Sequence, residues 1–267
     1  MRARIAEVLA SGSVQPGARE ADWLLDAAER RVSTEDEVVR VALELAARRA
    51  AGEPLQYVLG SAAFRHLELS VGPGVLVPRP ETEVLVDRAL RHLPEGGTVV
   101  DVGTGSGAIA LAIKQERPTA RVWATDDSRE ALHYARANRA QLDLDVEIVY
   151  GEMLNPLPKA LRRAMDLVVS NPPYVAESEH HLVEAGVMSH EPHHALFAGR
   201  DGLSIVRKLI DDAISWLRPG GWLVCEIGFG QAAAVEELFD KAGYRDAGVH
   251  KDLAGWDRIV EGRRVEG

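Results

Sequence analysis

Apolar side chains recur at helical spacing through the first part of the chain. The apolar positions within 5–9, 21–28 and 38–45 each fall on one face of a helix, so the pattern predicts three helices. The tetrapeptide STED at 33–36 is typical of a capping box that starts the third helix, and Gly52 with Pro54 marks its end. Helices of this kind pack their apolar faces together. We therefore expect a small helical domain over residues 1–63.

Shorter apolar pieces follow and then give way to a regular alternation. Between 64 and 80, the pieces HLELSV and VLVP are separated by Gly72-Pro73-Gly74, which predicts a hairpin or an extended linker. From 81 to 267, predicted helices alternate with predicted strands at 98–102, 121–126, 146–150, 165–170, 221–227 and, more weakly, near 245–250 and 256–261. Strands joined by crossover helices require a mostly parallel, doubly wound sheet. This region is therefore predicted to be an α/β domain, interrupted by a long irregular segment at 176–200.

Composition and charge narrow the classes of function. The formal net charge is −10, and basic residues form only short, scattered clusters such as Arg162-Arg163, so direct binding to nucleic acid is not expected. Cys225 is the single cysteine and lies in the apolar run GWLVCEI, where a buried thiol is expected. No apolar run approaches the roughly 20 residues of a membrane span, and the N-terminus lacks the apolar core of a signal peptide. We expect a cytoplasmic protein with no membrane partner.

A glycine-rich loop separates the first predicted strand of the α/β domain from the next helix. Glycine permits positive φ angles and a close approach of a ligand to the backbone, and the helix N-terminus offers free N–H groups. The residues of this loop are Gly103, Thr104, Gly105, Ser106 and Gly107. Asp126 ends the next strand, where an acid accepts hydrogen bonds from a ribose diol. Asp127 either shares this role or caps the following helix, and Glu152 and Met153 follow the third strand, where they can lie beside a purine.

The loop and its acid suit two cofactors equally well, because the spacing also satisfies a loose dinucleotide fingerprint. Nicotinamide dinucleotides and S-adenosylmethionine therefore both remain open on these residues alone. Three further features favour S-adenosylmethionine. They are Asp101, which can meet a cofactor ammonium or the loop amides, the turn at 218–221 before the fifth strand, and the tetrapeptide NPPY at 171–174.

The tetrapeptide NPPY indicates which group reacts. An amide or arylamine nitrogen is a poor nucleophile, so its two N–H bonds must be held and its lone pair aimed. The Asn171 side-chain oxygen and the Pro172 carbonyl are two acceptors that can hold one –NH2 group, while Pro173 stiffens the backbone and Tyr174 offers a flat face. We therefore predict Asn171, Pro172 and Tyr174 as catalytic residues and 171–174 as the substrate-binding segment, acting through orientation and preorganisation.

Six segments, in order, resemble those of one family. The chain resembles the release-factor glutamine methyltransferases, the HemK family of class I S-adenosylmethionine-dependent methyltransferases. The matching segments are EPLQYVLGSAAF at 53–64, VLVPRPETEVLV at 75–86, DVGTGSGAIALAI at 101–113, DLVVSNPPYV at 166–175, EPHHALFAGRDGL at 191–203 and LRPGGWLVCEIG at 217–228. The NPPY tetrapeptide is shared with adenine-N6 methyltransferases, and PRPETE with the helical N-terminal region makes the match specific.

The resemblance implies a fold, a reaction and a partner. The fold is Rossmann-like, with a mostly parallel seven-stranded sheet and an N-terminal helical domain that helps to dock the substrate protein. The reaction is methylation of the glutamine side-chain amide in the Gly-Gly-Gln motif of class 1 peptide chain release factors, giving N5-methylglutamine. Gly103 to Gly107, Asp126, Met153 and Asn171 would line the cofactor. The RPETE segment at 79–83 either borders the active site or simply starts a helix.

Other functions remain as alternatives. NPPY can also hold an exocyclic amine of adenine or guanine in a nucleic acid, although the net charge argues against it, and ribosomal-protein glutamine methylation is a related option. A non-catalytic binding module that keeps the cofactor fold is a third. The histidines at 180–181 and in HEPHH at 190–194 have metal-like spacing but no accompanying cysteine, so we expect no metal.

Overall fold

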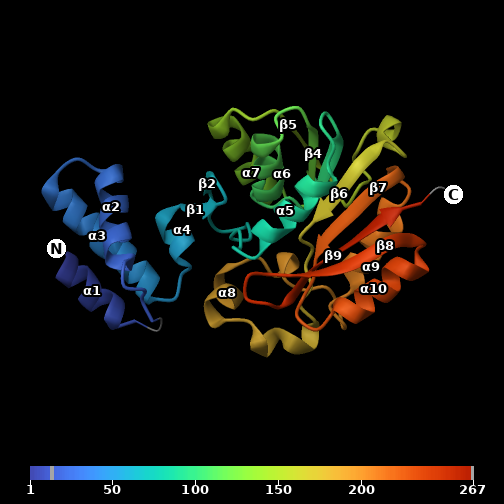
Figure 1. The fold of residues 1–267 in the computed structure, drawn as a ribbon. Helices are drawn as coiled ribbons and strands as arrows, with labels where there is room; N and C mark the ends of the chain where they lie inside the picture. The colour runs from blue at the N-terminus through green and yellow to red at the C-terminus, as the bar shows by residue number, and fades with distance from the viewer. Residues whose placement is uncertain (13–14, 266–267) are drawn as a thin grey trace.

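The computed structural model describes residues 1–12 and 15–265. The three predicted N-terminal helices are present as α1 (Arg2–Ala10), α2 (Glu20–Arg31) and α3 (Glu35–Ala50), and a short α4 (Leu55–Leu59) follows. They bury a core of their own that includes Ile5, Leu24 and Leu45. Figure 1 shows this group beside the sheet, with α4 and a small hairpin between them.

In this region the predicted side-chain cap is absent, and the hairpin lies earlier in the chain than predicted. Thr34 is the N-cap of α3, but its hydroxyl donates 2.6 Å to the Glu37 carboxylate rather than capping a backbone amide. The hairpin pairs β1 (Ser61–Phe64) with β2 (Leu67–Ser70), so it begins before residue 64, and the VLVP piece at 75–78 forms no strand. This piece makes a backbone hydrogen bond to a side chain instead of to another strand: the Val77 amide donates 3.2 Å to the Glu191 carboxylate.

A seven-stranded sheet forms the centre of the α/β domain, in the order β5-β4-β3-β6-β7-β9-β8. Its strands are β3 (Thr98–Val102), β4 (Arg121–Asp126), β5 (Val146–Tyr150), β6 (Met165–Ser170), β7 (Leu217–Glu226), β8 (Tyr244–Lys251) and β9 (Asp257–Arg264). Neighbours from β5 to β7 are parallel, and β9 is antiparallel to both β7 and β8. The predicted mostly parallel sheet is confirmed. The chain leaves β3 toward β4 and later returns to β3 with β6, so the strand order reverses there, and ligands bind at such switch points.

Helices cover both faces of the sheet because alternate strand residues point to opposite sides. On one face, Val99, Leu167 and Val224 pack with α5 (Thr82–His92) and α6 (Ala108–Glu116). On the other, Val100 and Val168 pack with α9 (Ser204–Ala213) and α10 (Ala232–Lys241). α7 (Arg129–Leu142) lies against β4, β5 and the small hairpin. These layers leave the carboxyl ends of the parallel strands available for a site.

The turn expected before the fifth strand is part of that strand. β7 already pairs at Leu217 with Met165, and the register then shifts so that Trp222 faces Leu167. The Arg-Pro-Gly-Gly residues therefore form a bulge. Gly221 is needed there, since a Cβ would lie 2.8 Å from the Met165 carbonyl oxygen. Cys225 on this strand is fully buried, and burial raises the pKa of its thiol to about 12, as expected for a packing residue.

The long segment after β6 contains three short helices, η2 (Glu177–Leu182), α8 (Ala185–His190) and η3 (His193–Ala195). Its histidine rings contact backbone carbonyls, for example His190 Nδ1 with Gly186 O at 3.0 Å and His193 Nε2 with Met188 O at 2.9 Å. In the described ranges, no three His, Cys, Asp or Glu side chains come together as a metal site. Among all the residues that the structure describes, no helix is both long enough and apolar enough to cross a membrane.

Candidate active site

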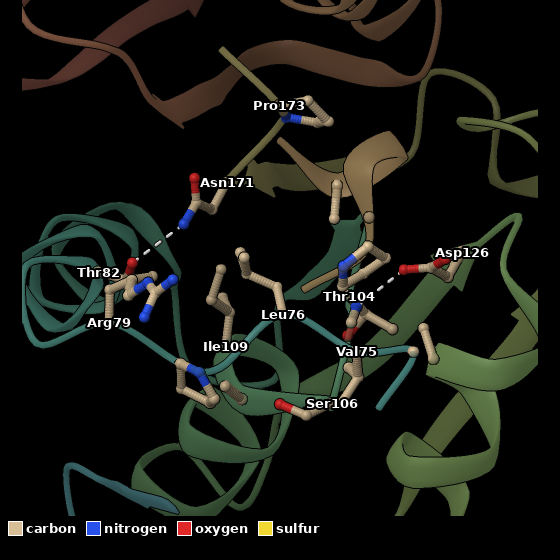
Figure 2. Close-up of a pocket in the computed structure, with 18 of the residues that line it drawn as sticks. Val75, Leu76, Arg79, Thr82, Thr104, Ser106, Ile109, Asp126, Asn171 and Pro173 are labelled. Carbon is tan, nitrogen blue, oxygen red and sulfur yellow. Dashed lines mark hydrogen bonds between the residues drawn. The ribbon is translucent and has the colours of Figure 1, made fainter. Parts of the chain in front are cut away.

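A cavity opens at the carboxyl ends of β3, β4 and β6, where the strand order reverses. The predicted residues Gly103, Thr104, Gly105, Ser106, Asp126 and Asn171 all line it. Pro173, from the same NPPY segment, and Asp127 also line it. Figure 2 shows the side chains of Thr104, Ser106, Asp126, Asn171 and Pro173 around one space, which Val75 and Leu76 from the segment before α5 also line. The structure therefore brings the glycine loop, its acid and the start of NPPY together.

The glycine loop is held in place by the neighbouring strand. The amides of Gly103 and Thr104 both donate to the Thr125 carbonyl oxygen, at 2.8 and 3.0 Å. Gly103 has φ = 72° and Gly105 has φ = 58°, angles that favour glycine. The Gly105 amide donates 2.8 Å to Asp126 Oδ2 (Figure 2). At Gly103 and Gly105 the loop consequently presents backbone, without Cβ atoms, to the cavity.

Asp126 organises this corner of the cavity. Its second oxygen, Oδ1, accepts from the Ser128 amide at 2.8 Å. Burial raises the pKa of the carboxyl, against the two backbone hydrogen bonds. Ser128, not Asp127, is the N-cap of α7, since its hydroxyl oxygen accepts from the Ala131 amide at 3.2 Å. Asp127 therefore does not cap α7, and it lines the cavity.

Asp101 lies beneath the loop and does not line the cavity. It is fully buried, and its Oδ2 accepts from the Thr104 hydroxyl at 2.6 Å and from the Ala110 amide at 3.2 Å. Its Oδ1 has no partner among the described residues. Burial raises the pKa of Asp101 to about 7. These contacts differ from the expected loop amides, because Asp101 holds the hydroxyl of Thr104 in the loop and an amide of α6.

Three residues considered from the sequence lie outside the cavity lining. Gly107 is the N-cap of α6 with φ = 87°, and a Cβ there would lie 2.9 Å from Leu111 Cδ1. Met153 packs on the core under β7 and α9, and its carbonyl accepts from the Thr125 hydroxyl at 2.8 Å. Glu152 forms an ion pair with Lys208. Contacts of Gly107 and Met153 with a cofactor remain predictions.

The NPPY segment leaves β6 between two cavities. Ser170 ends the strand, and its hydroxyl donates 2.6 Å to the Val102 carbonyl of the adjacent strand. Asn171 lines the first cavity and also a second, larger one on the far side of the segment. Pro172 and Tyr174 line only the second, together with Glu81 and Arg258. Asn171 is therefore positioned to act at the junction of the two spaces.

The acceptors predicted in NPPY are available. The Asn171 amide nitrogen donates 3.0 Å to Thr82 Oγ1, and its oxygen faces away from Thr82 (Figure 2). The Pro172 carbonyl accepts no hydrogen bond within the described part of the chain. The Tyr174 carbonyl is occupied by Gln231 Nε2 at 2.8 Å, which fixes the end of the segment. Burial raises the pKa of Tyr174 to about 12, so its phenol stays neutral.

Two residues at this site were given no individual role from the sequence, although one of them, Thr82, lies in the RPETE segment. Thr82, the first residue of α5, accepts from Asn171 and donates 2.7 Å to Glu226 Oε2. Glu226, the last residue of β7, is fully buried. The RPETE segment holds Thr82 and also Arg79, which lines both cavities and pairs with Glu191 at 2.7 Å. RPETE thus lines the first cavity through Arg79 and Thr82 and also starts α5, while its role in the active site stays a prediction.

Comparison with known proteins identifies the family. A family model described as the Methyltransferase small domain matches residues 80–199. A release factor glutamine methyltransferase of Geobacter sulfurreducens is 37% identical over 267 residues, which cover 96% of this chain and 92% of the relative. One from Neisseria gonorrhoeae is 44% identical over 232 residues, covering 86% and 84%.

Solved structures agree on the fold. A methyltransferase from Pyrococcus furiosus superposes with a TM-score of 0.58 at 20% identity, covering 76% of this chain and 92% of that one. Similarity at this level of identity establishes the architecture, while the closer sequence relatives establish the family. This chain therefore belongs to the release factor glutamine methyltransferase family and has the class I methyltransferase fold.

Proposed function

We propose that this protein transfers a methyl group from S-adenosyl-L-methionine to the glutamine side-chain amide in the Gly-Gly-Gln motif of class 1 peptide chain release factors. The product is N5-methylglutamine. The observation that carries this proposal is the position of Asn171, which lines both the glycine-loop cavity and the second cavity. A site for two reactants that meet at one amide needs this geometry.

The residues of the first cavity fit the methyl donor. The loop at Gly103 and Gly105 has positive φ angles and no side chains, so a ligand can approach its backbone. Asp126 and Asp127 supply carboxylate oxygens for a ribose diol. When bound, S-adenosylmethionine would supply an electrophilic methyl group: the N–CH3 bond would form as the S–CH3 bond breaks, leaving S-adenosylhomocysteine, and one N–H proton of the glutamine would be released to solvent.

The second cavity suits the glutamine side chain. Asn171 Oδ1 and the Pro172 carbonyl each accept one hydrogen of the –NH2 group and so point its lone pair toward the first cavity. The Tyr174 ring lines this space and lies 6.0 Å from the Arg258 guanidinium, which keeps it in place. Because both acceptors are fixed before the substrate arrives, little reorganisation is needed during the reaction.

The domain organisation supports a protein substrate. We infer that residues 1–63 help to dock the release factor, that 64–80 connect the domains and that 81–267 perform the transfer. The N-terminal helices carry an exposed aromatic side chain, Trp23, with 40% of its surface accessible. Exposed tryptophan is enriched among residues that dominate protein interfaces. A release factor partner also implies that the protein works in the cytoplasm, where translation ends.

Isotope transfer tests the proposal. The purified protein is incubated with a release factor and S-adenosylmethionine that carries a labelled methyl group, and the label is mapped by peptide mass spectrometry. We expect label on the glutamine of Gly-Gly-Gln and none when that glutamine is replaced by alanine. Label elsewhere, or label only on RNA or DNA added in its place, would refute the substrate assignment.

A further inference from the structure

Three side chains that lie far apart in the sequence form a continuous chain of hydrogen bonds, which starts at the Asn171 amide. Asn171 Nδ2 donates to Thr82 Oγ1 at 3.0 Å, and Thr82 Oγ1 donates to Glu226 Oε2 at 2.7 Å. Thr82 is 4% exposed and Glu226 is 0% exposed. Burying a carboxyl group is costly unless it is well paired, yet Glu226 Oε1 has no partner in the described structure. Packing alone therefore gives no reason for a carboxyl group here.

The chain has a direction because a hydroxyl group has one proton to donate. An ionised Glu226 can only accept, so the Thr82 proton points toward Glu226. The lone pairs of Thr82 Oγ1 then face Asn171 and can only accept. The Asn171 amide must consequently turn its nitrogen toward Thr82, which leaves Oδ1 directed away from Thr82 (Figure 2).

We propose that Thr82 and Glu226 are positioning residues that hold the Asn171 amide with its oxygen toward the substrate –NH2 group. This inference rests on the proposed function and extends it from NPPY to two distant residues. A free asparagine amide could present its own –NH2 to the substrate, and two donors cannot bind each other. The Thr82–Glu226 pair removes that wrong orientation before the substrate arrives.

The surroundings of Glu226 are consistent with control of the chain by protonation. Burial raises the pKa of Glu226 to about 7, opposed by the Thr82 hydrogen bond. Arg258 on β9 and Arg79 before α5 favour the charged form, and Glu81 opposes it. Tyr174 and Cys225 are neutral neighbours whose pKa values are both raised. The chain runs in the direction described while Glu226 is ionised, with Thr82 donating to Glu226 and accepting from Asn171.

Paired substitutions of Thr82 separate positioning from packing. Thr82→Val keeps the shape and removes the hydroxyl, whereas Thr82→Ser keeps the hydroxyl. We expect Thr82→Val to lower kcat on the release factor roughly tenfold or more while leaving the S-adenosylmethionine Kd unchanged, and Thr82→Ser to restore most of kcat. Tyr244→Phe is the matched control, because it removes another buried hydroxyl bond, to Ile210 O at 3.0 Å, away from the site. A wild-type kcat in Thr82→Val, or an equal loss in Thr82→Ser, would overturn the proposal.

A readout without substrate distinguishes this inference from the proposed function. The side-chain amide resonance of Asn171 is identified in the 15N–1H spectrum of the protein alone by its loss in Asn171→Ala. We expect one Asn171 amide proton to shift upfield in Thr82→Val and to stay in place in Thr82→Ser and Tyr244→Phe. An unshifted resonance in Thr82→Val refutes the chain even if the release factor is methylated. A shifted resonance supports the chain even if the release factor is not the substrate.

Discussion

Asn171 lies at the shared boundary of two cavities. Replacing it with alanine removes one of the two acceptors for the substrate –NH2 group. Loss of one preorganised hydrogen-bonding group in an active site costs about 10²–10³-fold in kcat. We expect a fall of this size in Asn171→Ala, with the circular dichroism spectrum unchanged. A kcat within about twofold of wild type would exclude the amide-holding mechanism.

Two buried carboxyl groups make the free energy of unfolding decrease as pH rises. Burial raises the pKa values of Asp101 and Glu226 to about 7, above those of the unfolded chain. The folded protein therefore binds more protons, and the stability contributed by these groups is lost as pH rises from about 4 through 7. We expect the free energy of unfolding in urea to fall less over this range in Glu226→Gln than in wild type. Parallel curves for the two proteins would contradict the raised pKa of Glu226.

Glu261 acts with the opposite sign. Although burial opposes it, the nearby His92 ring and the Arg88 guanidinium, whose Nε donates 2.9 Å to Glu261 Oε2, lower the pKa of this carboxyl to about 2. Its contribution to stability is present above the unfolded-state pKa near 4.5 and is lost as pH falls through about 2. The pH dependence attributed to Asp101 and Glu226 must therefore be measured above this range, where Glu261 stays ionised.

At the residue scale, the sequence predicts what is local and misses what is distant. The glycine loop, Asp126 and the NPPY segment are contiguous motifs with their own chemistry, and most of them meet in one cavity. Thr82 lies 89 residues before Asn171 and 144 before Glu226. A threonine at a helix start and an acid at a strand end carry no signal of that contact, because only the sheet order brings α5, β6 and β7 together.

The loop before α9 passes very close to the end of the NPPY segment. Gly202, which precedes α9, has φ = 71°, and a Cβ there would overlap the Tyr174 carbonyl oxygen and lie 2.7 Å from Gln231 Nε2. We expect Gly202→Ala to displace the end of NPPY and lower kcat, with a loss of unfolding free energy of roughly 1–3 kcal/mol or more from the strained backbone.

Gly243→Ala is the control for this prediction. Gly243 has a similar φ of 86°, but a Cβ there would meet nothing within 4 Å. It should therefore lose stability through backbone strain alone and keep its kcat. Urea unfolding and initial rates are measured for both variants. Equal kcat values in the two would show that the contact between Gly202 and NPPY does not matter for turnover.

At the element scale, periodicity is a good guide to regular structure and a poor one to its irregular parts. Each strand of the large sheet falls where alternation or an apolar run predicts it, since side-chain burial sets both. The VLVP piece has strand-like residues, yet the amide of Val77 within it donates to the carboxylate of Glu191, 114 residues later in the sequence. The bulge at 218–221 likewise depends on the neighbouring strand, which the local sequence does not contain.

For the whole molecule, the separate core of the N-terminal helices is the feature that remains to be connected with function. These helices bury Ile5, Leu24 and Leu45 in a cluster distinct from those that flank the sheet. The domain is thus not needed to complete the sheet's own core. A docking role for it predicts that changes on its surface alter recognition of the substrate protein and not the chemical step.

Trp23→Ala tests this role. The Trp23 side chain is 40% exposed, with the Arg19 guanidinium 5.7 Å from its ring. Truncating an aromatic residue that dominates an interface costs about 2 kcal/mol or more, so we expect KM for the release factor to rise by more than about tenfold at unchanged kcat. KM for a short Gly-Gly-Gln peptide, which cannot reach the N-terminal domain, should stay the same. Tyr150→Ala serves as control, because that ring is 44% exposed with Arg129 at 4.2 Å but lies on β5. An equal rise in KM for the release factor in both variants, or no rise in Trp23→Ala, would show that the N-terminal helices do not dock the substrate through this surface.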